Sequence, residues 1–75
     1  MKLTAQQQEA RIAILHDMEE RFGGKATWSQ LHSRGHHYMQ VSAAALRGDL
    51  RTVMDYHYEI TPSGRQALAS KGGER

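Results

Sequence analysis

Five histidines give this 75-residue chain its most obvious candidates for chemistry. His32 and His36 are four residues apart, a spacing at which two imidazoles on one helix could bind a metal ion. Gly35 is expected to end a helix between them, and no Cys or nearby acidic residue completes a set of ligands. We therefore expect no metal site, and we expect His36 and His37 to contact phosphate when they are protonated.

Catalysis has little support in the sequence. The serines at 29, 33 and 42 stand in no pattern that joins a nucleophile to a base and an orienting group. Gly23-Gly24-Lys25 lacks the spacing of a phosphate-binding loop. We expect no enzyme activity and no cofactor.

Composition indicates one small domain with a mildly basic surface. The chain has no Cys, so disulfides cannot supplement its modest core. No apolar run is long enough to span a membrane, and residues 1–8 lack the apolar centre of a signal peptide, so we expect a cytoplasmic protein that makes no contact with a membrane. The formal net charge is +2, and residues 25–55, with four Lys or Arg and two Asp or Glu, are the most basic part.

The elements that would position these residues begin with two capped helices. Thr4 and Gln7 form a capping box for a first helix expected over residues 4–22, which Gly23-Gly24 ends. A short extended segment is expected at residues 25–27. Thr27 then pairs with Gln30 in a second capping box for a helix of about two turns. A polar connector is expected at residues 36–40.

A third helix is expected from Ser42, as N-cap, to about Met54. Leu46, Leu50 and Val53 follow one another at helical spacing and predict its buried face. An interior Gly costs a helix about 1 kcal/mol relative to Ala, but the spacing carries through Gly48 and favours a continuous helix. The opposite face holds Ala44, Arg47, Gly48 and Arg51.

The last part of the chain reads as a strand that turns directly into a helix. Tyr58 and Ile60 share one face of a strand over residues 56–60, which could pair with residues 25–27. Thr61 suits an N-cap and Pro62 the first helical position. This helix is expected to end near Ser70, and residues 71–75 are expected to form a flexible tail.

Two segments resemble the winged helix-turn-helix family of DNA-binding proteins. Residues 58–68 match its aromatic, any, aliphatic, Thr, Pro, any, Gly, Arg pattern, and residues 41–46 are similar to the start of its recognition helices. The resemblance implies a mainly α domain over residues 1–70, with a three-helix core, short strands and a C-terminal helix. Two departures are the long connector and the near absence of a wing, since residues 55–58 leave little room for a hairpin loop.

The resemblance implies a sequence-specific transcriptional regulator, such as a repressor of bacterial, phage or plasmid origin, that binds double-stranded DNA as a dimer. The third helix would enter the major groove, where Arg47 or Arg51 could form bidentate hydrogen bonds with guanine. Ser42 and the helix N-terminus could bind phosphate. The residues expected to contact DNA are Arg34, His37, Gln40, Ser42, Ala44, Arg47 and Arg51.

The alternative is a protein-interaction module on the same scaffold, because a fold does not determine a function. An inhibitor or an assembly adaptor encoded by a mobile element would fit. The small wing and the modest charge favour this alternative, and the sequence leaves it open beside the first.

Overall fold

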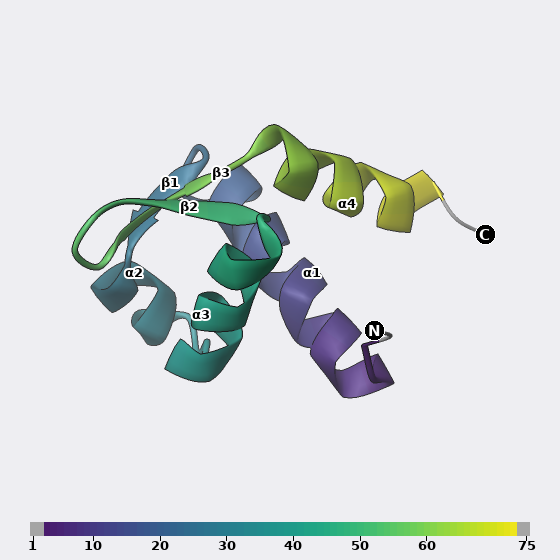
Figure 1. Ribbon diagram of the computed structural model, residues 1–75, viewed down its shortest axis with the longest axis horizontal. Coiled ribbons are helices and arrows are strands. Elements are labelled where there is room, and N and C mark those ends of the chain that lie inside the picture. Colours follow the sequence, from purple (N-terminus) through teal and green to yellow (C-terminus); the bar gives the residue numbers. More distant parts are fainter. Residues whose placement is uncertain (1–2, 74–75) are drawn as a thin grey trace.

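The computed structural model describes residues 3–73, and their side chains as far as residue 70. It is mainly helical with a small β element, as expected from the sequence, and that element is a three-stranded antiparallel sheet with one strand more than expected (Figure 1). The elements in chain order are α1 (Ala5–Glu20), β1 (Lys25–Thr27), α2 (Trp28–Ser33), α3 (Tyr38–Arg47), β2 (Leu50–Met54), β3 (His57–Ile60) and α4 (Pro62–Gly73).

The starts of the first two helices are confirmed. The Thr4 hydroxyl accepts the Gln7 N–H at 3.1 Å, and the Gln7 side chain accepts the Thr4 N–H at 3.0 Å. Thr27 and Gln30 make the same reciprocal pair, at 3.2 and 2.8 Å. These bonds satisfy N–H groups that the first turn of a helix leaves without partners.

The prediction of one helix over residues 42–54 is wrong. Gly48 has a φ of 93°, in the left-handed region, and its N–H bonds back to the carbonyls of Ala44 and Ala45, so it ends α3. Residues 50–54 form strand β2 instead. The start was also misplaced, because His37, not Ser42, is the N-cap of α3. Only residues 34–37 therefore separate α2 from α3, and the long connector does not exist.

The predicted buried face of that helix fails with it. Leu46 is 88% exposed and Val53 is 51% exposed, while Leu50 is 2% exposed as part of the sheet. The buried face of α3 consists of Val41 and Ala44. Helical spacing places residues on one face only within a single helix. Leu46 belongs to α3 whereas Leu50 and Val53 belong to β2, so their spacing did not define a common face.

The sheet has β3 in the centre, with β1 and β2 antiparallel on either side. Ala26 lies opposite Tyr58, so the pairing of residues 25–27 with the last strand, which the sequence left open, is present. On the other side, β2 and β3 form a hairpin with Asp55 and Tyr56 as its turn, so the expected near absence of a hairpin was wrong. The carbonyl of Tyr56 accepts the Trp28 N–H at 2.8 Å, which fixes this turn to the start of α2.

The core lies between α1, α3 and the inner face of the sheet. Leu15, Met18, Tyr58 and Ile60 are buried, and α1 packs against both α3 and α4 (Figure 1). Among residues 3–70, the buried apolar residues are Ile14, Leu15, Met18, Ala26, Leu31, Val41, Ala44, Leu50, Tyr58 and Ile60.

The junction between β3 and α4 explains the Thr-Pro-x-Gly pattern. The Thr61 hydroxyl accepts the Gly64 N–H at 3.0 Å and lies 3.0 Å from the Asp49 carbonyl oxygen, to which it can donate. A Cβ at Gly64 would lie 2.2 Å from that same carbonyl oxygen, so only glycine fits. The helix α4 continues to Gly73, so residues 71–73 of the expected tail are helical, and residues 74–75 lie outside the described part.

Candidate nucleic-acid interface

A helix pair and a hairpin form the candidate interface. The helix α2, a turn of four residues (34–37) and α3 are followed by the β2–β3 hairpin, which lies beside α3 (Figure 1). Three- or four-residue turns of this kind are typical of the helix-turn-helix. The arrangement leaves one face of α3 uncovered by the rest of the described chain.

That uncovered face is mainly apolar. Met39 is 77% exposed and Leu46 is 88% exposed, and the half-buried Ser42 and Ala43 lie between them at helical spacing. No Lys or Arg lies on this stripe. The basic reading face expected from the sequence is therefore not the face that α3 exposes.

Three of the predicted site residues do gather at the start of α3. Arg34 is the C-cap of α2, and its guanidinium lies 3.6 Å from the Asp17 carboxylate. His37 is exposed as the N-cap of α3, and Gln40 is half-buried in the first turn.

Ser42 and Ala44 are separated by the helix geometry. Ser42 lines a hollow between α3 and the hairpin. Ala44 is fully buried against the core, so its predicted contact with DNA is wrong. Its methyl group packs inside the protein and cannot meet a base.

Arg47 belongs to a cluster around a buried carboxylate. Asp49 is 2% exposed and accepts two hydrogen bonds from Arg11, at 2.7 and 3.0 Å. Arg47 Nε lies 3.4 Å from the same carboxylate, and its side chain is 24% exposed. The hydrogen bonding that Arg11 donates to Asp49 raises the pKa of Arg11. The sequence suggested that Arg47 lies on an open helix face. In the structure its side chain is instead held against Asp49.

Arg51 lies on β2 and not on α3. It pairs across the hairpin with Glu59, with which it also forms an ion pair, and Lys25 lies 3.9 Å from that carboxylate. The Arg51 hydrogen bond is the largest of several influences that hold the pKa of Glu59 below its ordinary value. Exposed pairs of this type contribute little stability, so Arg51 can exchange its partner for another anion.

Every Lys and Arg side chain within residues 3–70 lies 3.9 Å or less from a carboxylate. Asp17 is a second centre of such pairs, with His36 Nε2 at 2.7 Å and Arg21 and Arg34 at 3.5 and 3.6 Å. A phosphate group that approaches this surface must therefore compete with carboxylates that are already in place.

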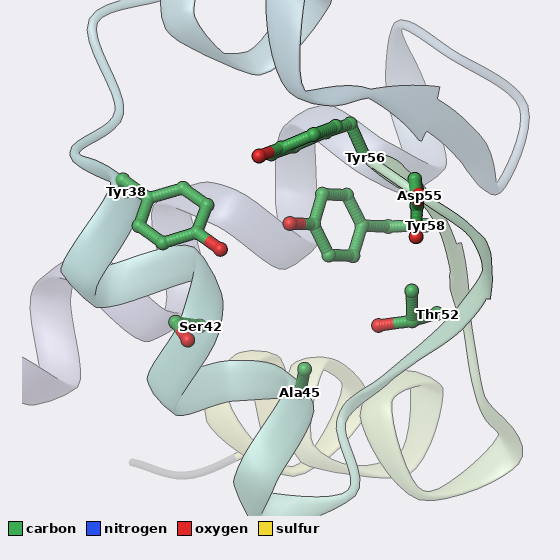
Figure 2. A pocket seen from close by; sticks show the side chains of 7 residues that line it. All are labelled: Tyr38, Ser42, Ala45, Thr52, Asp55, Tyr56 and Tyr58. Carbon is green, nitrogen blue, oxygen red and sulfur yellow. The ribbon is translucent and has the colours of Figure 1, made fainter.

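The hollow between α3 and the hairpin contains groups that the sequence interpretation missed. It has a volume of about 310 Å³, and the hydroxyls of Tyr38, Tyr56 and Tyr58 converge on it from two sides (Figure 2). Burial of the ring, reinforced by the nearby Tyr38, raises the pKa of Tyr58. The sequence interpretation missed them because it continued the helix across residues 50–54, which form strand β2 and do not alternate apolar with polar side chains.

A second hollow, of about 460 Å³, lies against the same turn. Asp55 and Tyr56 line both hollows, and Trp28 and His57 line only the second. The ring of Trp28 in turn meets Tyr38 edge to face, with centroids 5.3 Å apart. The hairpin turn is thus surrounded by aromatic side chains.

The described residues contain neither a metal-binding cluster nor a membrane-spanning helix. Residues 3–73 contain no group of three or more His, Asp or Glu side chains arranged to hold a metal ion. None of the described helices has the length and apolar character needed to cross a membrane.

The chain matches no protein-family model, no curated protein and no solved structure.

Proposed function

We propose that this chain binds double-stranded DNA as a winged helix-turn-helix module. The observation that carries the proposal is the order of elements: α2, a turn of four residues, α3, and then a hairpin beside α3 that joins a three-stranded sheet. The α3 helix has ten residues, and a helix of this size fits the major groove of B-form DNA, which is about 12 Å wide. The hairpin would lie along the neighbouring backbone.

The contacts proposed on α3 come from its first turns. His37 and Gln40 would meet phosphate or base edges, and Met39 would supply apolar contact, as to a thymine methyl group. Arg34 and Arg51 would bind phosphates on either side of the helix. Ala44 and Arg47 are left out, because the first is buried and the second is held by Asp49.

The ion pairs of Arg34 and Arg51 do not prevent such contacts. Both arginines are exposed, at 40% and 67% of their side-chain surface. The Arg51–Glu59 pair is of the exposed kind that contributes little stability, so Arg51 can exchange its carboxylate for a phosphate at small cost. Asp17 is buried, but it keeps Arg21 at 3.5 Å as a partner when Arg34 turns to a phosphate. A net charge of +2 supplies only weak attraction, and binding as a dimer would double the number of contacts.

Binding of duplex DNA can be tested by fluorescence anisotropy at several salt concentrations. Affinity should fall as salt rises, and Arg34→Gln and Arg51→Gln should each reduce the slope of that dependence by about one. Arg65→Gln is the matched control, because Arg65 also carries one charge and pairs with Glu19 at 3.0 Å, but lies on α4. No binding at low salt, or equal effects of all three substitutions, would contradict the proposal.

A second candidate is a protein-interaction module. It is favoured by the exposure of six large apolar side chains, which is unusual when they cluster. Three of them lie on α3, two lie on β2 and one lies on the hairpin turn. Uncharged side chains of this kind are better suited to contact a protein than to contact phosphate groups. The exposed residues are Tyr38, Met39, Leu46, Val53, Met54 and Tyr56.

The substitution Leu46→Ser separates the two candidates. It should leave duplex binding nearly unchanged, because Leu46 lies in the last turn of α3, far from the proposed first-turn contacts. It should abolish capture of a stoichiometric protein partner if the apolar face binds one. Sedimentation equilibrium of the same variant tests whether that face also joins two copies of the chain.

A further inference from the structure

The hollow between α3 and the hairpin has an unusual chemical lining. Its charge and its rings, rather than its size, indicate the class of ligand that would fit. Five of its seven lining residues carry a hydroxyl group and one carries a carboxylate, and no Lys, Arg or His is among them. The lining residues are Tyr38, Ser42, Ala45, Thr52, Asp55, Tyr56 and Tyr58.

We propose that this hollow binds an organic cation, either a guanidinium or a substituted ammonium group. The faces of aromatic rings attract cations, and the effect is strongest where water is partly excluded. The hydroxyl oxygens of Tyr38, Tyr56 and Tyr58 can accept hydrogen bonds from such a group. The Asp55 carboxylate supplies the only formal charge in the lining, and its sign excludes a preference for phosphate.

The position of Tyr56 supports a built site. Its φ of 61° is the only positive value among the described residues other than glycine, and bulky residues rarely adopt it. The conformation is held in place by the bond from the Trp28 N–H to the Tyr56 carbonyl, at 2.8 Å. Short hairpin turns favour a positive φ, so the turn and this hydrogen bond together fix the backbone of Tyr56. This conformation turns the Tyr56 ring toward Tyr38 and Tyr58 (Figure 2).

The neighbouring ion pairs do not fill the hollow. The nearest hairpin cation, Arg51, is paired with Glu59, and the lining of the hollow contains neither residue. Within residues 3–70, no ion pair involves Asp55. Its carboxylate is therefore available to a cation that enters from solvent.

The test is an NMR amide-shift titration of the full chain with N-acetyl-arginine amide. N-acetyl-citrulline amide is the matched ligand, because it has the same shape without the charge. The arginine compound should shift the amides of Tyr38, Ser42, Thr52 and Tyr56 and approach saturation, with an affinity about tenfold or more above that of the citrulline compound. Equal affinity of the two compounds, or shifts only elsewhere, would overturn the proposal.

Variants assign the binding to particular groups. Asp55→Asn and Tyr56→Asn should each weaken binding about tenfold, and asparagine tolerates the backbone conformation at position 56. Glu9→Gln is the control for net charge, since Glu9 is exposed on α1, and it should leave binding unchanged. An equal loss in Glu9→Gln would indicate diffuse attraction and would refute a specific site.

Two more probes identify the source of the cation. Tetramethylammonium represents a free small cation, and a capped Gly-Ser-Arg-Ser-Gly peptide represents a basic side chain of a partner protein. Tighter binding of either one supports the site and indicates its natural ligand. If inorganic phosphate produces the same pattern of shifts at constant salt, the hollow is an anion site and the proposal is wrong.

Discussion

The substitution Gly64→Ala tests the structural reading of the Thr-Pro-x-Gly pattern. Gly64 lies in the first turn of α4, where a helix would ordinarily prefer Ala by up to about 1 kcal/mol. Propensity alone therefore predicts a more stable protein. The packing of Gly64 against the Asp49 carbonyl predicts the opposite sign.

The size of the effect follows from the contacts of the added methyl group. It would lie 2.2 Å from the Asp49 carbonyl oxygen and 3.0 Å from Ile60 Cγ1, and the first of these is a backbone atom that cannot rotate away. Overpacking of this kind costs about 1–3 kcal/mol. Displacement of α4 would also weaken the hydrogen bonds of Thr61, at about 1 kcal/mol each. After the helix preference is subtracted, we expect a net loss of about 1–2 kcal/mol or more.

Thermal unfolding followed by circular dichroism measures this loss. For a domain of this size, the expected loss lowers Tm by about 4–16 °C. Ser63→Ala is the matched control, because Ser63 is exposed in the same turn and should change Tm little. A Tm for Gly64→Ala equal to or above that of the unmodified chain would refute the account of this junction.

Three further predictions concern the charged pairs and the end of α3. Asp49→Asn should lower the free energy of unfolding by about 2–4 kcal/mol in urea, because it removes the charge partner of Arg11 at a buried position. In an NMR pH titration, Glu59 should titrate with a pKa below its ordinary value of 4.5. Its pair with Arg51 therefore stabilises the fold above pH 4.5, and this stabilisation is lost as the pH falls through the lowered pKa. Arg51→Gln should return the titration midpoint of Glu59 toward 4.5. Gly48→Ala should cost about 1–2 kcal/mol in urea unfolding, because φ is 93° there, and Gly48→Asn should cost less.

Local signals in the sequence predicted the elements that depend on local chemistry. The capping boxes of Thr4 and Thr27 involve residues three apart, so they could be recognised without knowledge of the fold. The same is true of Thr61 and Pro62 at the start of α4. The alternation of Tyr58 and Ile60 likewise indicated the last strand, and its pairing with residues 25–27, left open by the sequence, is present as the pairing of β1 with β3.

The middle of the chain could not be predicted in the same way, because two local signals conflicted at Gly48. The spacing of Leu46, Leu50 and Val53 favoured a continuous helix, while glycine favoured a stop. The tertiary structure decides between them: Leu50 is needed in the sheet opposite Ile60, and α3 must therefore end before it. The sequence around Leu46 contains no feature that predicts the exposure of this leucine.

The wrong prediction of one continuous helix over residues 42–54 affected the candidate site more than the rest of the fold. Arg47 and Arg51 were placed on one helix face, but the first is drawn to Asp49 and the second lies on a strand. Ala44 was placed outside because the register of the helix was inferred from the wrong buried residues. Arg34 and His37 precede the third helix both in the prediction and in the structure, because a position ahead of the helix depends little on its register.

The bond between Trp28 and Tyr56 has a consequence for the mechanics of the hairpin. Its base is held where Thr61 meets Asp49, and its turn is held where the Tyr56 carbonyl meets α2. A strand pair anchored at both ends cannot swing as a free arm, so little conformational entropy remains to be lost when it meets another molecule. Any molecule that binds between α3 and the hairpin must therefore fit a gap whose width is already set.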